Sequence, residues 1–294
     1  MSITNISDMS AQVRQNWSDI FVEELREDDL LVNLLNRDYE GEIGPGGNEV
    51  KVTQWQDAAG EIATIGVDDD SFNPEKMAES QISINANKIF SASFQFTSMA
   101  KLQSQLESAD SEIRNALLAG VRKQMNSYLY GLFLGTNNTG SVTDFNAAQI
   151  SALRVLAGQN KWKKDGNWFL MADSSYYGDI LNAATLTSSD HIDDRPTVAG
   201  NIGTKRFGFN IFEDNSDGLL DVIGAAAVGG TDTADVALAF HRDAVHFVMQ
   251  SEAQFSIADL TANKQRGFVI KVDVIGGGAA GHDHAALHHV VFNT

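Results

Sequence analysis

The sequence contains no cysteine among its 294 residues. Disulfide bonds, thiolate zinc sites, iron–sulfur clusters and cysteine nucleophiles are therefore excluded. No run of about 18 apolar residues occurs, so no membrane span is expected. The N-terminal residues, MSITNISDMSAQV, lack the basic patch and apolar block of a signal peptide. These absences favour synthesis in a reducing cytoplasm.

Basic residues are scarce. The 21 Lys and Arg residues face 39 Asp and Glu residues, which gives a formal net charge of −18. Such an acidic surface is poorly suited to general nucleic-acid binding, because attraction to phosphate needs clustered Lys and Arg. It would instead repel DNA placed close to it. The hydrophobic content of 43% is sufficient for a packed core of one large domain or two ordinary ones.

Residues 82–134 carry the strongest secondary-structure signal. Apolar residues alternate from Ile82 to Phe96, which predicts one long strand of roughly 50 Å. Apolar residues then recur every three or four positions from Leu102 to Leu132, which predicts a helix of about the same length. A cap is expected at Thr97 or Ser98, with a second within 108–111. Elements this long suit an extended subunit that is completed by its neighbours.

The N-terminal third predicts an arm and a projection. Residues 8–36 have a mostly helical pattern, and the glycine-rich residues 41–47 interrupt it. Residues 50–55 alternate as a strand, and the polar, turn-rich residues 56–78 separate them from the long strand. Because a two-stranded ribbon is marginal in water and has exposed edges, we expect it to lie across another subunit.

The C-terminal half is predicted to consist of short helices and strands that follow one another. Helices are expected at 147–156 and 174–184, and a short helix or turn at 241–248. Residues 185–197 are expected to form a polar loop, and residues 217–232 are an Ala- and Gly-rich region. Strands are expected at 168–171, 207–212, 235–240, 253–257, 268–275 and 287–292.

Two glycine and histidine motifs near the C-terminus invite a functional interpretation. Gly276, Gly278 and Gly281 match the dinucleotide-binding pattern, but only 13 residues follow, too few for the rest of that fold. A flexible connector is expected there. The histidines could bind zinc or nickel, but they lie in a Gly/Ala-rich segment without a rigid frame and with one neighbouring carboxylate, Asp283, so we predict only adventitious binding. They are His282, His284, His288 and His289.

Other candidate sites are weaker. The acidic triplet 68–70 lacks the calcium-binding loop spacing and is expected to be a solvated loop tip. Ser174, Asp173 and His191 could be imagined as a triad, but their spacing does not define a geometry. We predict structural roles for all three. The sequence therefore predicts no catalytic, cofactor-binding or metal-binding residues.

The predicted order of arm, long hairpin, long helix and mixed region extends over nearly the whole chain. It is accompanied by four characteristic sequence segments: 94–97 leading into 102–105, 166–171 followed by 173–181, 200–203 followed by 207–212, and 237–241 with Ala244. The order and these segments resemble tailed-bacteriophage (Caudovirales-type) major capsid proteins of the Hong Kong 97-like fold family. Arg242 stands where the family phrase has lysine.

The resemblance implies an α+β fold with named parts. Residues 1–41 would form an N-terminal arm, 42–97 an extended β-hairpin loop, and 98–147 a peripheral domain with a long spine helix. Residues 148–250 would form an axial domain, 251–276 the return strands of the peripheral domain, and 277–294 a C-terminal segment.

The resemblance also implies a function without enzymatic activity. The chain would self-assemble as pentamers and hexamers into an icosahedral shell enclosing phage double-stranded DNA, which it meets only by non-specific proximity. A scaffolding protein, a portal and possibly decoration proteins would be partners, with assembly in the host bacterial cytoplasm and residence in the virion. Some relatives cross-link through a loop lysine. Lys51, Lys76 and Lys88 lie in this loop, but no residue is identified as an acceptor.

Two alternatives stay open from the sequence. One is an encapsulin-like bacterial compartment shell, which shares the fold. The other, from a different class, is an acidic α/β hydrolase or small-molecule binding protein that uses the region 148–250.

Overall fold

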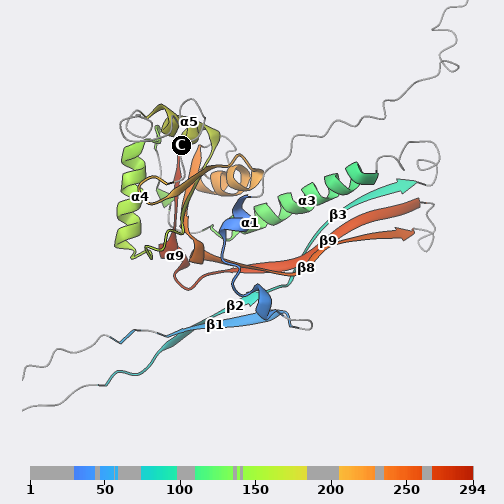
Figure 1. Ribbon diagram of the computed structural model, residues 1–294, viewed down its shortest axis with the longest axis horizontal. Coiled ribbons are helices and arrows are strands. Elements are labelled where there is room, and N and C mark those ends of the chain that lie inside the picture. Colours follow the sequence, from blue (N-terminus) through green and yellow to red (C-terminus); the bar gives the residue numbers. More distant parts are fainter. Residues whose placement is uncertain are drawn as a thin grey trace, which may run out of the picture.

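Three sheets and one long helix organise the chain. The computed structural model describes residues 30–43, 47–55, 57–58, 74–97, 110–134, 138–139, 142–183, 205–228, 235–259 and 267–293. A helix-covered, five-stranded sheet forms one end of the molecule (Figure 1). A three-stranded sheet and helix α3 extend from it in one direction, and a two-stranded hairpin extends in the other. The subunit is therefore elongated, as the two long elements predict.

Helix α3 (Asp110–Gly131) is the backbone of the extended part. Its buried residues recur about every four positions at Leu117, Val121, Met125 and Leu129. Its 22 residues span about 33 Å. The helix predicted from 102 to 132 is confirmed from Asp110 onward, which lies within the predicted second cap. Residues 98–109 and the first predicted cap lie outside the described residues.

The apolar stripe of α3 packs on an antiparallel sheet ordered β3-β9-β8. The strands are β3 (Lys88–Thr97), β9 (Gly267–Ala280) and β8 (Val245–Asp259). Phe90 of β3 lies against Tyr128 of α3, with ring centroids 5.5 Å apart. Val272 and Val274 of β9 belong to the same buried cluster. This burial holds the helix lengthwise on the sheet.

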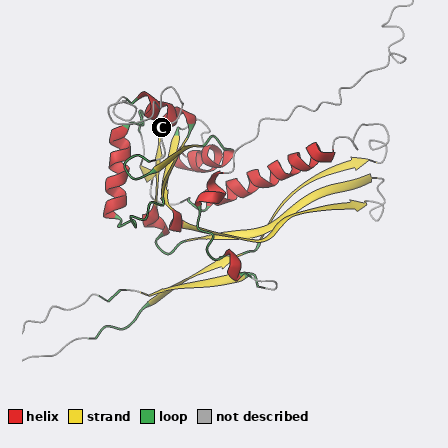
Figure 2. Cartoon of the chain, in the orientation of Figure 1, coloured by secondary structure: helices red, strands yellow, loops and turns green. Residues whose placement is uncertain are grey.

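The five-stranded sheet is ordered β4-β10-β7-β5-β6. Its strands are β4 (Asn138–Thr139), β10 (His288–Phe292), β7 (Val236–His241), β5 (Trp168–Ala172) and β6 (Asn210–Glu213). Every residue of β5 and β7 is buried, because both faces are covered. Helices α4 (Ala147–Gln159) and α5 (Ser174–Asn182) lie on one side (Figure 2). The predicted helices at 147–156 and 174–184 are confirmed.

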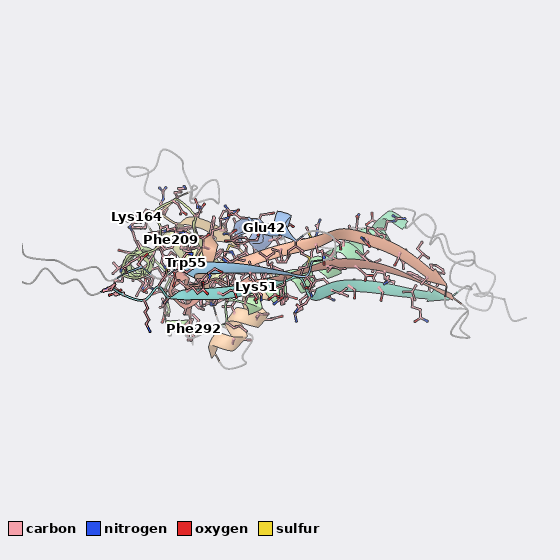
Figure 3. The ribbon with its side chains drawn as sticks, turned by 90° about the horizontal axis from the view of Figure 1, so that it is seen from below. Glu42, Lys51, Trp55, Lys164, Phe209 and Phe292 are labelled. Carbon is pink, nitrogen blue, oxygen red and sulfur yellow. The ribbon has the colours of Figure 1, made fainter. Side chains whose placement is uncertain are left out.

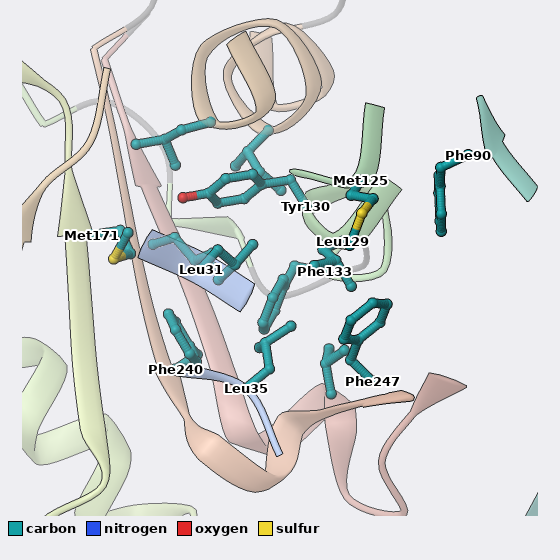
Figure 4. Close-up of a cluster of buried hydrophobic side chains, with 14 of the residues drawn as sticks. Leu31, Leu35, Phe90, Met125, Leu129, Tyr130, Phe133, Met171, Phe240 and Phe247 are labelled. Atoms are coloured by element: carbon teal, nitrogen blue, oxygen red, sulfur yellow. The ribbon is translucent and has the colours of Figure 1, made fainter. Parts of the chain in front are cut away.

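The other face of this sheet joins the α3 core. It packs against α1 (Leu30–Leu34), the π-helix η3 (Gly218–Gly224) and the C-terminal end of α3. Helix α8 (Ala225–Val228) follows η3. Figure 4 shows Tyr130 and Phe133 from the α3 end beside Leu31 and Phe240. One continuous cluster therefore ties the extended part to the five-stranded sheet.

No helix in the described ranges is both long and apolar enough to cross a membrane.

The hairpin consists of β1 (Glu49–Trp55) and β2 (Glu79–Asn85), paired antiparallel from Glu49↔Asn85 to Trp55↔Glu79. A short 3-10 helix, Glu40–Glu42, precedes it. A small separate cluster anchors its base, where Val50 and Ile84 pack with Ile43 and Val248. The strand predicted at 50–55 and the two-stranded projection are thereby confirmed.

The prediction of a single strand through residues 82–96 is wrong. The strand is interrupted at Ala86 and Asn87, so that β2 pairs with β1 while β3 pairs with β9. Both segments run in the same general direction in Figures 1 and 3. Alternation continues across the break because Ile84, Ala86 and Phe90 are all buried. Periodicity reports which face is buried and cannot report that the partner strand changes.

Two smaller predictions need correction, and a third segment has a structure for which no prediction was made. The segment 241–248 is a 3-10 turn only at Arg242–Ala244, since β8 begins at Val245 and contains the predicted strand 253–257. The strand predicted at 207–212 begins at Asn210, because Phe207 and Gly208 adopt φ values of 50° and 93° in a turn. The Ala- and Gly-rich region 217–232 forms helices at 218–228. The loop at 185–197 lies outside the described residues.

Gly276–Gly278 form a close crossing of strands, which corrects the expected flexible connector. All three glycines belong to β9. A Cβ on Gly277 would overlap the carbonyl oxygen of Asn85, where β2 crosses β9. A Cβ on Gly276 or Gly278 would lie 2.9 or 2.8 Å from a carbonyl oxygen of β8. The glycines are therefore required by the close approach of three backbones.

Substitution Gly277→Ala should destabilise the chain by roughly 1–3 kcal/mol or more, because the added methyl must push β2 away from β9. Gly131→Ala is the matched control, since a Cβ there meets nothing within 4 Å. That change should be neutral or stabilising by up to about 1 kcal/mol. Denaturant unfolding of the unassembled chain measures both. Equal stability of the two variants would contradict the crossing argument.

Candidate assembly surfaces

The three-stranded sheet has one covered and one uncovered face. Helix α3 runs along one face, and within the described residues no helix runs along the opposite face, where the short 3-10 helix Glu40–Glu42 contacts β8 beside the hairpin base (Figures 1 and 2). The hairpin covers only the end of that face near the five-stranded sheet. Ile89 of β3 lies on this uncovered face and is 67% exposed, and Ser91 and Ser93 of the same strand are exposed beside it. A second polypeptide could lie along this face.

The far end of the same sheet exposes large apolar side chains. Phe94, Phe255 and Ile257 are 42%, 38% and 66% exposed. The register pairs Phe94 and Ile257 with Ile270, so they lie on the α3 side of the sheet. The Arg114 guanidinium sits 5.3 Å from the centre of the Phe255 ring. Exposed apolar clusters of this kind are typical of interaction surfaces.

The hairpin presents a further exposed surface. Trp55 at the end of β1 is 54% exposed, and Met77 just before β2 is 75% exposed. Figure 3 shows Lys51 and Trp55 on the ribbon that leaves the body. The strands β1 and β2 have no third partner in the described part of the chain. The hairpin therefore offers side chains and free strand edges to a neighbour.

A cleft of about 900 Å³ lies where the hairpin meets the body. Tyr39, Val52–Trp55, Lys161, His246 and His282 are among its lining residues. His282 spans it, with Nδ1 3.0 Å from the Ser80 hydroxyl and Nε2 3.1 Å from the Val52 carbonyl oxygen. The cleft is thus crossed by polar contacts that hold the hairpin. Within the described residues, no three His, Asp or Glu side chains are grouped to hold a metal.

The structure divides the predicted histidine cluster. His284 in α9 (His284–Leu287) and His288 in β10 stack, with ring centroids 4.3 Å apart, against Phe133. His282 turns to the hairpin instead, and His289 follows His288 on β10. The Trp162 indole donates to the Ala286 carbonyl at 2.6 Å. The segment is therefore packed, which corrects the expectation that it lacks a rigid frame.

Asp173 and Ser174 are engaged at the start of α5. The Asp173 carboxylate accepts from the backbone N–H groups of Ser175 and Tyr176. The Ser174 hydroxyl donates to the Asn215 side chain at 2.8 Å. His191 and the triplet 68–70 lie outside the described residues. Asp173 thus caps α5, while Ser174 ties the start of α5 to Asn215 in the loop after β6.

The remaining sequence candidates lie on the surface or in strands. Lys51, Lys76 and Lys88 are all exposed, and cross-linking through them stays a prediction. The family phrases correspond to β5, α5, β6 and β7, while 102–105 and 200–203 lie outside the described residues. Arg242, the departure from the family phrase, donates to Asp38 at 3.0 Å.

Sequence reasoning missed the contacts at the hairpin base. His246 and Gly277 meet residues of the hairpin region that are distant in sequence. In the sequence, the glycine run 276–278 was the one sign of a close backbone contact. It was interpreted as part of a possible nucleotide-binding motif instead.

Comparison with known proteins decides the family. The model of the family described as phage capsid protein matches residues 99–286. The chain belongs to the phage capsid protein family. A structure from Mycobacterium phage Che8 is similar over 96% of this chain and 97% of that chain, with a TM-score of 0.70 at 20% identity.

Further structures share the fold of this capsid protein. The similarity to the capsid structure of cyanophage P-SCSP1u extends over 100% of this chain and 95% of the cyanophage chain, with a TM-score of 0.69 at 12% identity. The similarity to the acid-stable capsid structure of Helicobacter pylori bacteriophage KHP30 extends over 100% of this chain and 98% of the KHP30 chain, with a TM-score of 0.70 at 10% identity. No curated protein sequence matches the chain significantly.

These findings confirm the predicted fold and general function. The capsid protein has a Hong Kong 97-like α+β fold, is a structural component of the virion, and is not an enzyme. It associates with copies of itself in a shell. Neither the encapsulin-like compartment nor the acidic hydrolase is favoured.

The Asp173 carboxyl gives a pH-dependent prediction. Burial, with the nearby Asp235 charge adding to it, raises the pKa of Asp173 to about 6. A raised carboxyl pKa contributes stability at low pH that is lost as the pH rises through 6. Asp173→Asn keeps a capping oxygen and removes the charge, so at pH 8 it should stabilise the capsid protein by up to about 3 kcal/mol.

Urea unfolding at pH 8 and pH 4 measures this effect. The advantage of Asp173→Asn should vanish near pH 4, where both proteins are uncharged at this position. Asp144→Asn, at an exposed aspartate, is the control. A pH-independent difference for Asp173→Asn would count against the assignment.

Proposed function

We propose that the capsid protein assembles as pentamers and hexamers that close into an icosahedral shell around double-stranded DNA. The observation that carries this proposal is the hairpin β1–β2, which projects from the body with Trp55 and Met77 exposed. A two-stranded ribbon is marginal alone. It becomes stable when it buries these side chains on a second copy.

The uncovered face of the three-stranded sheet supports this geometry. It offers Ile89 between polar side chains, a composition suited to a contact that forms during assembly. A hairpin laid along it would add to other contacts between neighbouring subunits. Together these can exceed the roughly 1,600 Å² of a standard interface. The shell would then be held by non-covalent burial in a protein without cysteine.

The domain assignment follows the same geometry. Residues 1–41 act as the arm, 42–97 as the extended loop, and 98–147 as the peripheral domain with α3 as its spine. Residues 148–250 form the axial domain, 251–276 the return strands, and 277–294 the C-terminal segment. The three-stranded sheet draws residues from four of these parts, because β3 lies in 42–97, β8 crosses the boundary at 250 and β9 crosses the boundary at 276.

Assembly in the host bacterial cytoplasm, with a scaffolding protein, a portal and possibly decoration proteins, completes the proposal. The DNA is held by confinement and non-specific proximity. The net charge of −18 supports this, since an acidic inner wall repels the genome weakly and lets it move.

Deletion of residues 58–76 tests the role of the hairpin. The deletion leaves the paired residues of β1 and β2 intact and joins them through a four-residue loop, a length that hairpins accept. The variant should fold but form no closed shells. Electron microscopy and size-exclusion chromatography detect the loss, and circular dichroism checks the fold.

A matched variant carries a Gly/Ser segment of equal length in place of 58–76. It separates the loss of specific side chains from the loss of reach. Normal shells from the deletion variant would refute the role given to the loop.

A further inference from the structure

Two pairs of histidines lie on either side of the junction between the hairpin, the end of α3 and the five-stranded sheet. They are His246 of β8, His282 after β9, His284 of α9 and His288 of β10. We call this group the histidine joint. Two members contact the hairpin region and two contact Phe133 at the end of α3, although three of the four lie within seven residues of sequence.

The hairpin side of the joint depends on His282. Its ring lies within hydrogen-bonding distance of Ser80 on β2 and of the Val52 carbonyl on β1, so one side chain holds both strands. His246 lies behind it, 6% exposed, with its ring edge on to Tyr39 at 5.3 Å. The cleft around them also contains Asp38, Asp243, Asp283, His241, Lys161 and Lys163.

The spine side of the joint is the stacked pair His284 and His288. Both rings lie at the C-terminal end of α3 and contact Phe133, with centroids 6.1 and 5.9 Å away. The His288 Nδ1–H donates to the His284 carbonyl oxygen at 2.7 Å. His289 is the other titratable group beside them.

The geometry of the pair makes it sensitive to protons. Two imidazolium rings 4.3 Å apart in a half-buried site would repel, so proton uptake favours their separation. Separation would move His284 and α9 away from Phe133 at the end of α3. Because His282 lies only two residues before His284, the same movement would draw His282 away from Ser80 and Val52.

We propose that the histidine joint is an acid-sensitive lock: neutral imidazoles hold the hairpin strands at Val52 and Ser80 against the body, and protonation releases the strands there while the hairpin root at Gly277 stays packed. The lock acts within one subunit, so it does not depend on how the shell assembles.

The direction of the pH response follows from the environment of the pair. Burial and the neighbouring His288 lower the pKa of His284 to about 4, and burial lowers the pKa of His288. In the released state the two histidines bind protons at a higher pH than they do in the docked state. The docked state therefore has its full stability above about pH 6.5 and loses it as the pH falls toward 4. Burial also lowers the pKa of His246, but Asp243 and Asp38 oppose this. The stacked pair is therefore the sensor, and His282 is the contact that it releases.

The absence of cysteine allows a direct test. Spin labels at Lys51→Cys and Lys164→Cys would report the distance between the exposed hairpin and the exposed body (Figure 3). The labelled full chain is diluted into excess unlabelled chain, so that only distances within one subunit contribute. Double electron–electron resonance is recorded at pH 8 and pH 4.5. The ratio of displaced to docked hairpin should rise roughly 10- to 100-fold at pH 4.5.

Three variants locate the sensor. His284→Phe keeps a flat ring on His288 and Phe133 but cannot titrate, so its distances should stay at the pH 8 values. His289→Phe, one position beyond His288, should respond as the unsubstituted chain does. His282→Ala should displace the hairpin already at pH 8.

Circular dichroism at pH 8 confirms folding, and His284→Gln replaces His284→Phe if the latter is unfolded. Unchanged distances in the unsubstituted chain, or an undiminished response in the non-titrating variant, would overturn the proposal.

Discussion

Burial of the α3 stripe is the interaction on which the rest of the subunit depends. Along its length the helix covers β3 and β9, and at its C-terminal end Tyr130 and Phe133 enter the core of the five-stranded sheet. The Tyr130 hydroxyl donates to the buried Asp214 carboxylate there, which fixes the helix end against the loop before η3. In the described residues no other helix runs along the extended sheet, so without α3 it would lose its core.

The second constraint is the crossing at Gly277. It brings the hairpin base directly onto β9, with room for no side chain. Around this point, Val50 and Ile84 bury a small cluster and the Gln250 side chain donates to the Gly47 carbonyl at 2.8 Å. The hairpin is thus fixed at its root while its strands remain exposed. This combination gives a subunit that is folded by itself and still has surface to bury in a shell.

Much of this architecture was predictable from local patterns. The stripe from Ile113 to Leu129 and the continuous burial of 168–171 and 236–240 follow from short-range patterns in the sequence. Asn146 and Asp173 cap the helices that follow them. The change of partner between β2 and β3 was not predictable, because the same alternation serves both sheets. The packed roles of Gly277 and His282 depend on contacts with Asn85 and Val52, about 190 and 230 residues away in sequence, and no local pattern encodes such contacts.

The continuity of β2 into β3 has a mechanical consequence. A neighbour that pulls on the hairpin along its length pulls on the same covalent chain that forms β3. That strand pairs with β9 from Lys88↔Gly276 to Thr97↔Gly267, so the force acts along the strands and loads the whole ladder in shear. Hydrogen bonds loaded together resist far more than bonds opened one at a time. Tension between subunits would therefore pass into the sheet beneath α3 without peeling it apart.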